Sequence, residues 1–191
     1  MGQVKIEVND KIKAYSPYHP DLPAPAKRLG GRWDASARCW TYDVRDEERV
    51  RELYTKIYGT YGEAATGDLV NIRVIFHKEF YERRSGIYVA GRCLGRATGR
   101  DSGAKLAEGV ILLEGRITSG GSVKNWGTEA TEGTVVEVRD VPRAKAQEEI
   151  DNPSDYFAVE IIEDETNEEA LLAEREKLMA RIAEIDAILN R

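Results

Sequence analysis

Apolar and polar residues alternate over short stretches near the N-terminus, a pattern typical of β-strands with one buried face. Residues 4–8 read Val-Lys-Ile-Glu-Val, and Asn-Asp at residues 9–10 is a turn signal. Residues 11–15 alternate again in the same sense. The pattern therefore predicts a β-hairpin as the first element.

A second hairpin is predicted in residues 27–43, KRLGGRWDASARCWTYD. If residues 35–38 form a four-residue loop, Trp33 lies directly opposite Trp40 and the two rings share one face of the hairpin. A neighbouring amphipathic helix would need an apolar partner. We therefore interpret the tryptophans as core residues rather than as a surface for ligand stacking.

Two helices flank this hairpin in the sequence. Residues 21–30 combine Asp21 as a candidate N-cap with prolines in the first turn and Gly30 as a left-handed end. The second helix runs from an Asp46 cap to Gly59, with apolar residues at i, i+3, i+4 and i+7.

The chain divides into an N-terminal α+β module (1–60), a linker (61–68), a β-rich domain (69–163) and a C-terminal helix (166–191). The β-rich domain shows five strand-like stretches, which favour a barrel-like antiparallel sheet. The fold class predicted for the whole chain is α+β.

Two glycine-rich stretches of the β-rich domain, residues 95–109 and 118–133, read as long loops. Ordinary connections have about 4–6 residues, and longer loops are often functional. We therefore treat both stretches as candidate binding loops.

The C-terminal helix begins with a capping-box spacing between Thr166 and Glu169. An apolar seam interrupted by Arg175 resembles a short coiled coil, and its members are Leu171, Leu178, Ile182, Ile185 and Leu189. The seam predicts either a homodimer, through pairing with a second copy, or folding back on the chain's own body.

The net charge of −6 is unevenly distributed. Residues 1–110 contain 19 Lys and Arg against 15 Asp and Glu, whereas residues 151–191 contain 4 against 12. An acidic chain does not coat DNA, but a locally basic face can bind it. No membrane-spanning run or signal peptide is apparent, so we expect a cytoplasmic protein without a membrane partner.

The composition gives no sign of catalysis or of a cofactor. Cys39 and Cys93 lack metal-binding spacing and are expected to be free thiols rather than a disulfide. His19 and His77 lie outside any nucleophile motif, and phosphate-loop, dinucleotide and metalloprotease signatures are absent. A metal-dependent nuclease would need an Asp followed by Glu-x-Lys on a strand. Asp155 and Glu160 fit the acidic positions, but Ile162 stands where the lysine is required. We predict a non-enzymatic protein with no cofactor and no metal.

Two groups of residues are candidates for binding nucleic acid or a partner. The first surrounds the tryptophan hairpin and consists of Lys27, Arg28, Arg32 and Arg38. The second lies on the predicted strand and loops of the β-rich domain and consists of Arg92, Arg96, Arg100, Lys105, Lys124, Asn125 and Trp126. Cations suit phosphates, and an exposed loop tryptophan suits base stacking.

Residues 21–59 resemble a short module of phage and plasmid proteins, in which Lys precedes a Gly-Arg-Trp-Asp step and a second Trp follows. The matching positions are Lys27, Gly31, Trp33, Asp34 and Trp40. The segment is also similar, more distantly, to the HARP domain of annealing helicases, which recognises DNA forks. The resemblance implies a DNA-associated accessory module of phage or mobile-element origin.

The function favoured by the sequence is therefore that of an accessory protein, phage or mobile-element in type, that binds single-stranded or forked DNA or a nucleic-acid-processing complex. The main alternative is an inhibitor of a host defence system, similar to an anti-CRISPR protein, whose acidic surface mimics DNA. The nuclease remains a third and weaker alternative.

Overall fold

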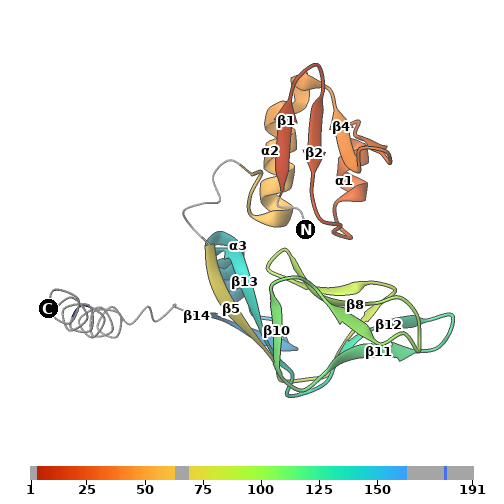
Figure 1. Cartoon of the computed structure of the whole chain (residues 1–191), viewed down its shortest axis with the longest axis vertical. Helices are drawn as coiled ribbons and strands as arrows, with labels where there is room; N and C mark the ends of the chain where they lie inside the picture. Colours follow the sequence, from red (N-terminus) through yellow and green to blue (C-terminus); the bar gives the residue numbers. More distant parts are fainter. Residues whose placement is uncertain (1–3, 63–68, 163–178, 180–191) are drawn as a thin grey trace, which may run out of the picture.

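The computed structural model describes residues 4–62, 69–162 and 179. These residues form two bodies with separate hydrophobic cores, an N-terminal module and a β domain (Figure 1). Each body is built around antiparallel β-sheets.

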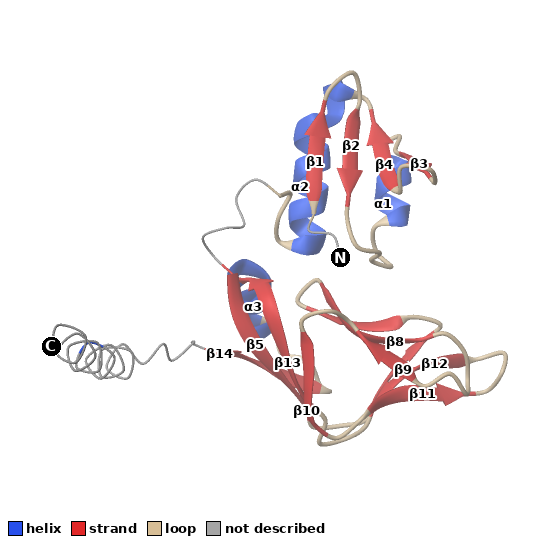
Figure 2. Ribbon diagram, viewed as in Figure 1, coloured by secondary structure: helices blue, strands red, loops and turns tan. Residues whose placement is uncertain are grey.

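The N-terminal module is one four-stranded sheet with two α-helices. Its strand order is β1-β2-β4-β3, with β1 Lys5–Val8, β2 Ile12–Tyr15, β3 Arg32–Asp34 and β4 Cys39–Tyr42. The helices are α1 Pro23–Arg28 and α2 Glu47–Tyr58, the latter preceded by a 3-10 turn at Val44–Asp46. Both helices lie behind the sheet in Figure 2, so they cover the same face.

The core of the module lies between that face and the helices. Alternation along β2 and β4 points Ala14 and Trp40 toward the helices, where Val50 and Tyr54 of α2 meet them in one buried cluster. The amphipathic pattern therefore predicted both the helix and its buried side correctly. The first hairpin is also confirmed, with Val8 opposite Ile12.

The helix ends differ in part from the sequence prediction. Gly30 and Gly59 have the predicted left-handed φ angles of 73° and 75°. The two predicted N-caps are wrong, because neither helix has a side-chain cap hydrogen bond. Asp21 instead lies beside His19, and Asp43 caps the 3-10 turn by accepting from the Arg45 N–H.

The β domain contains ten strands and one helix in its described residues. Its three antiparallel sheets have the orders β10-β13-β5-β14, β11-β12-β6 and β7-β8-β9. The strands are β5 Leu69–Phe76, β6 Phe80–Arg83, β7 Gly86–Val89, β8 Arg92–Ala97, β9 Ala104–Leu106, β10 Val110–Glu114, β11 Ile117–Gly121, β12 Trp126–Ala130, β13 Val135–Pro142 and β14 Phe157–Ile162. Helix α3, Arg143–Asp151, packs against β5, β13 and β14.

The three sheets share one core. Ile72 of β5 lies in the same buried cluster as Leu94 of β8 and Ala130 of β12. Thr128 joins two of the sheets, because its buried hydroxyl accepts from the Ala97 N–H at 2.9 Å and donates to the Ser85 carbonyl at 2.6 Å. The β domain is therefore a single packed unit.

The α+β prediction for the whole chain is wrong. Residues 4–62 and 69–162 contain fourteen strands in four antiparallel sheets but only three α-helices, so the described structure is mainly β. The predicted C-terminal helix and its seam, Leu171, Leu178, Ile182, Ile185 and Leu189, lie outside the described residues. The class was misjudged because strands were missed in glycine-rich sequence.

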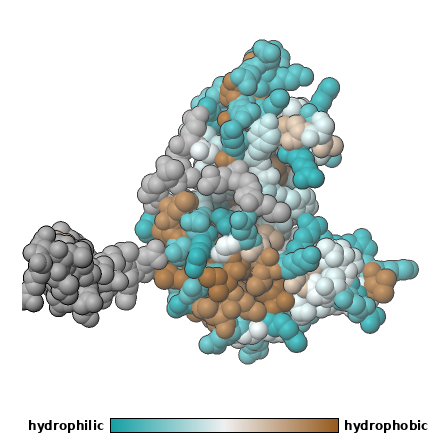
Figure 3. All heavy atoms as spheres, in the orientation of Figure 1, coloured by the Kyte–Doolittle hydropathy of each residue, from teal (hydrophilic) through white to brown (hydrophobic). Residues whose placement is uncertain are grey.

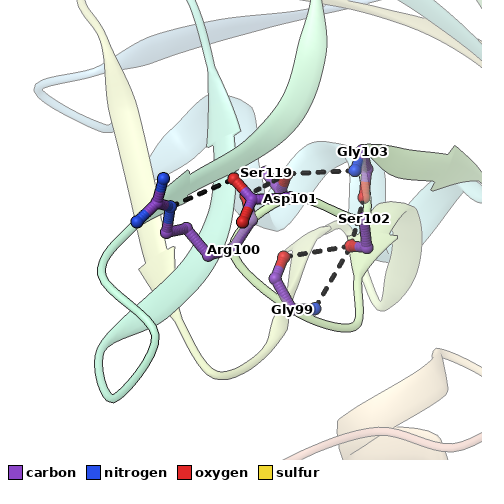
Figure 4. Close-up of polar contacts among 6 residues, drawn as sticks. All are labelled: Gly99, Arg100, Asp101, Ser102, Gly103 and Ser119. Carbon is purple, nitrogen blue, oxygen red and sulfur yellow. Dashed lines mark hydrogen bonds and ion pairs between the residues drawn. The ribbon is translucent and has the colours of Figure 1, made fainter.

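Both predicted long loops contain strands. Residues 95–109 continue β8 and include β9, and residues 118–133 include most of β11 and all of β12. What remains of the first loop is a compact turn at residues 98–103 (Figure 4). There the Ser102 hydroxyl accepts from the Gly99 N–H, and the Ser119 hydroxyl accepts from the Gly103 N–H at 3.0 Å.

One of the five stretches that the sequence predicted as single strands, residues 86–94, is a tight hairpin. Strands β7 and β8 are joined at Ala90 and Gly91, whose φ angles are 49° and 73°. Two successive positive φ angles are the geometry of a two-residue type I′ turn.

Among the described residues, no helix has the length and apolar character needed to cross a bilayer.

The N-terminal module packs on the β7–β8 hairpin through His19. The imidazole is 7% exposed and meets the rings of Tyr58 and Tyr88 at centroid distances of 5.8 and 4.7 Å. Arg96 of β8 lies 5.1 Å above the Tyr18 ring. His19 therefore belongs to the contact between the two bodies.

We expect the stability of this contact to fall in acid. Burial lowers the pKa of His19 from 6.5; the nearby Asp21 charge opposes this and Lys145 adds to it. The unfolded chain then binds the proton more readily than the folded chain, so stability is complete above the unfolded pKa and declines as the pH falls below it. Thermal unfolding between about pH 8 and pH 5 measures this, and His19→Gln should flatten the decline. Equal declines in both proteins would refute the assignment to His19.

Candidate nucleic-acid interface

The tryptophan hairpin is positioned by the Gly-Gly step before it. Gly31 lies so close to the core that a Cβ atom there would come within 2.5 Å of the Tyr42 ring and 2.7 Å of the Ala26 carbonyl. Only glycine allows the chain to pass from α1 into β3 at this distance. The step therefore lets β3 follow α1 directly, and β3 is the edge strand of the sheet.

The hairpin loop is organised by Asp34. One carboxylate oxygen accepts from the Ser36 hydroxyl at 2.7 Å, the Ser36 N–H at 2.9 Å and the Ala37 N–H at 3.0 Å. These hydrogen bonds, led by that of the Ser36 hydroxyl, hold the pKa of Asp34 below its usual range. The loop closes at Arg38, whose φ of 52° is left-handed. The loop is thus a defined turn, and it fixes the position of Arg38 at the end of the turn.

The register of the hairpin is the predicted one, with Trp33 paired to Trp40 and Asp34 to Cys39. The two rings meet edge to face, with centroids 5.7 Å apart. Their environments differ, because Trp40 is 7% exposed whereas Trp33 is 51% exposed. The prediction that the rings belong to the core is therefore confirmed for Trp40 and wrong for Trp33.

All four predicted cations around the hairpin are exposed, namely Lys27, Arg28, Arg32 and Arg38. Lys27 and Arg28 end α1, and Arg32 lies next to Trp33 on the edge strand. Successive side chains of a strand point to opposite faces, so Arg32 points away from the tryptophan face. Cations and a half-exposed ring therefore flank the same free sheet edge.

The second predicted group is dispersed. Arg92 braces a loop by donating to the Asp140 carbonyl at 3.1 Å, and Arg96 lies over Tyr18. Arg100 pairs with Asp101 at 3.0 Å in the turn of Figure 4. Lys105 is exposed on β9, opposite Arg96. Arg92 and Arg96 therefore have structural partners, and the group does not form one basic surface.

Lys124, Asn125 and Trp126 lie at the β11–β12 turn. Lys124 and Asn125 are exposed in the turn itself. Trp126 is not the exposed loop residue that was predicted, because it begins β12, pairs with Gly121 and is half-buried. The argument for base stacking on Trp126 assumed an exposed loop residue, and it therefore does not hold.

Sequence reasoning missed the residues that accompany this turn. Arg83 ends β6 and Arg84 follows it; both are exposed beside the turn, and Val123 at its tip is 74% exposed. The Arg-Arg-Ser-Gly sequence at residues 83–86 is a turn signal with two cations, and it could have drawn attention to this region.

The described residues contain no group of three or more His, Cys, Asp or Glu that could hold a metal ion. Cys39 is a buried free thiol and Cys93 a half-buried one, as predicted, and burial raises the pKa of both. His77 is exposed and hydrogen bonds to the Asp155 carbonyl. An open depression of about 800 Å³ along α2 is lined by side chains of both charges.

Comparison of the chain with family models, with curated proteins and with solved structures found no match.

Proposed function

We propose that this protein is a non-enzymatic accessory protein that binds single-stranded nucleic acid along the free edge of its tryptophan hairpin. The observation that carries the proposal is Trp33, which exposes half of its ring while Trp40 and the hairpin hold it in place. A fixed aromatic face stacks on any base and contributes about 1–3 kcal/mol per base.

The charges on the hairpin support the same ligand. Arg32 and Arg38 are exposed on the hairpin, within the basic N-terminal part of an acidic chain. A strand lying along β3 would place a base against Trp33 and its phosphates near these guanidinium groups. The resemblance of residues 21–59 to DNA-associated modules of phage and plasmid proteins favours DNA and a mobile-element origin.

A protein-directed inhibitor is the second candidate. It is favoured by the outer face of the β10-β13-β5-β14 sheet, where Ile111 and Leu113 are exposed, and Figure 3 shows hydrophobic surface over this region. Exposed apolar patches often mark protein interfaces. An inhibitor of this kind would have no affinity for nucleic acid, which distinguishes the two candidates.

Replacing Trp33 by alanine should weaken binding to a labelled oligothymidine of about 15 nucleotides by about tenfold, because one stacking contact is lost. Fluorescence anisotropy at low salt measures the change. Tyr156→Ala is the matched control, since Tyr156 is an exposed aromatic residue of the β domain, and it should bind like the unaltered chain. Equal affinities of the two variants would rule out stacking on Trp33.

A further inference from the structure

The turn between β11 and β12, residues 122–125, projects from the β domain on the side opposite to strand β14 (Figure 1). Figure 3 shows a small hydrophobic surface at this end, set among hydrophilic surface. Val123 is 74% exposed, more than any other large hydrophobic residue in the described structure. A single exposed valine is ordinary by itself, so its setting decides what it means.

The turn is held rigidly by its own backbone and by strand β6. The Asn125 N–H donates to the Ser122 carbonyl at 3.0 Å, which closes the turn. The Tyr81 hydroxyl donates to the Asn125 carbonyl at 2.5 Å, and Arg84 donates to the Lys124 carbonyl at 2.6 Å. Its own hydrogen bond and the contacts from Tyr81 and Arg84 thus hold the loop, and Val123 is exposed at its tip.

A third contact orients a cation beside the tip. Arg83 donates to the side-chain oxygen of Asn125. A guanidinium group has five N–H donors, so this bond leaves donors for a ligand. Arg83 and Arg84 are both exposed, and Lys124 is exposed next to Val123.

The segments of the chain that form the tip and the neighbouring β6–β7 turn contain no acidic residues. Residues 83–100 and 115–128 contain no Asp or Glu. The nearest carboxylates on these strands, Glu82 and Glu129, lie farther back along the hairpin. The tip therefore combines one exposed apolar side chain, Val123, with three nearby cations, Arg83, Arg84 and Lys124. The net charge of the whole chain, by contrast, is −6.

From this arrangement we infer that the β11–β12 tip is a second nucleic-acid contact, which places Val123 in the minor groove of a duplex. Lys124 and Arg83 bind the flanking phosphates. Apolar side chains inserted into the minor groove, with cations beside them, are a common device of duplex-bending proteins. The inference rests on the proposed function and extends it from single strands to duplexes.

A membrane surface fits the same features less well. Interfacial binding uses a broad apolar face, often with Trp, Phe and Leu. The tip presents one valine, and its aromatic neighbour Tyr81 is engaged with the Asn125 carbonyl. One small apolar point with cations around it fits a narrow groove between two lines of phosphates.

The test compares the full chain with Val123→Ser and Lys124→Glu variants on a duplex of about two helical turns and on oligothymidine. Both changes are at exposed turn positions. Each should lower duplex affinity by about tenfold and leave oligothymidine affinity within about twofold. Lys124→Glu should also reduce the salt slope by about 0.9, whereas Val123→Ser should leave it unchanged.

Lys78→Glu is the matched control, because Lys78 is exposed in the β5–β6 turn and the charge change is the same. It should bind duplex like the unaltered chain. Unchanged duplex affinity in both tip variants, with oligothymidine binding still dependent on Trp33, would overturn the tip inference alone. Absence of binding to either nucleic acid would overturn the proposed function as well. Tip-dependent binding to phosphatidylserine vesicles but not to duplex would assign the tip to a membrane instead.

Discussion

Replacing Trp40 by alanine is expected to destabilise the N-terminal module by about 3–5 kcal/mol, the usual cost of removing a large aromatic side chain from a core. Trp40 is 7% exposed and lies in one cluster with Ala14, Val50 and Tyr54. The surrounding sheet and helices cannot collapse into the space, because the hairpin is fixed by its register with β2.

The same substitution at Trp33 should cost much less, about 1 kcal/mol, because Trp33 loses mainly its edge-to-face contact. Urea denaturation followed by circular dichroism gives both values. The pair of variants serves as its own control, since the residue types and the hairpin are the same. Similar losses of stability would contradict the assignment of one tryptophan to the core and the other to the ligand.

Reversing the charge of Arg32 and Arg38 together is expected to weaken binding to oligothymidine by at least about tenfold at low salt. Both side chains are exposed on the hairpin, and neither is needed for the core. Each phosphate contact contributes about 0.7 to the salt slope for a single strand, so the slope should fall by about 1.4.

Arg49→Glu with Lys56→Glu provides the control for this change. Both residues are exposed on α2, which covers the opposite face of the sheet from Arg32, and the net charge changes equally. The control should keep the salt slope of the unaltered chain. If both double variants lose affinity to the same degree, net charge rather than the hairpin determines binding.

The parts of the fold that local sequence determines could be predicted. The register of the tryptophan hairpin follows from strict alternation around a four-residue loop, and the helix before Gly59 follows from its apolar period. The N-caps could not be inferred in this way, because Asp21 and Asp46 are acceptable caps in isolation. Asp21 lies beside His19 instead, and the His19 ring is buried against Tyr58 and Tyr88.

The strands of the β domain that were not predicted lie in glycine-rich sequence, which was interpreted as loop. A Cβ atom on Gly127 of β12 would come within 2.6 Å of the Tyr81 ring, which lies across the strand. Glycine is therefore required there by a neighbour on β6, not by a flexible loop. A single sequence does not show this pairing, because Tyr81 is far from Gly127 along the chain.

The candidate site was predictable to the extent that charge and local pairing determine it. The cations of the hairpin were found from the sequence, and they are exposed as expected. The exposure of Trp33 could not be foreseen, because it depends on β3 being the edge strand of its sheet. Arg83 and Val123 were missed because they come together only when β6 pairs with β12.

The measurement that tests the central claim most directly is a titration of the unaltered chain with oligothymidine, followed by tryptophan fluorescence. Because Trp33 is half exposed, a base stacked on its ring should quench its emission. The quenching should saturate at low salt and decline as salt is added. Fluorescence that stays unchanged at low salt, together with unchanged anisotropy of a labelled oligonucleotide, would contradict the assignment of nucleic acid as the ligand.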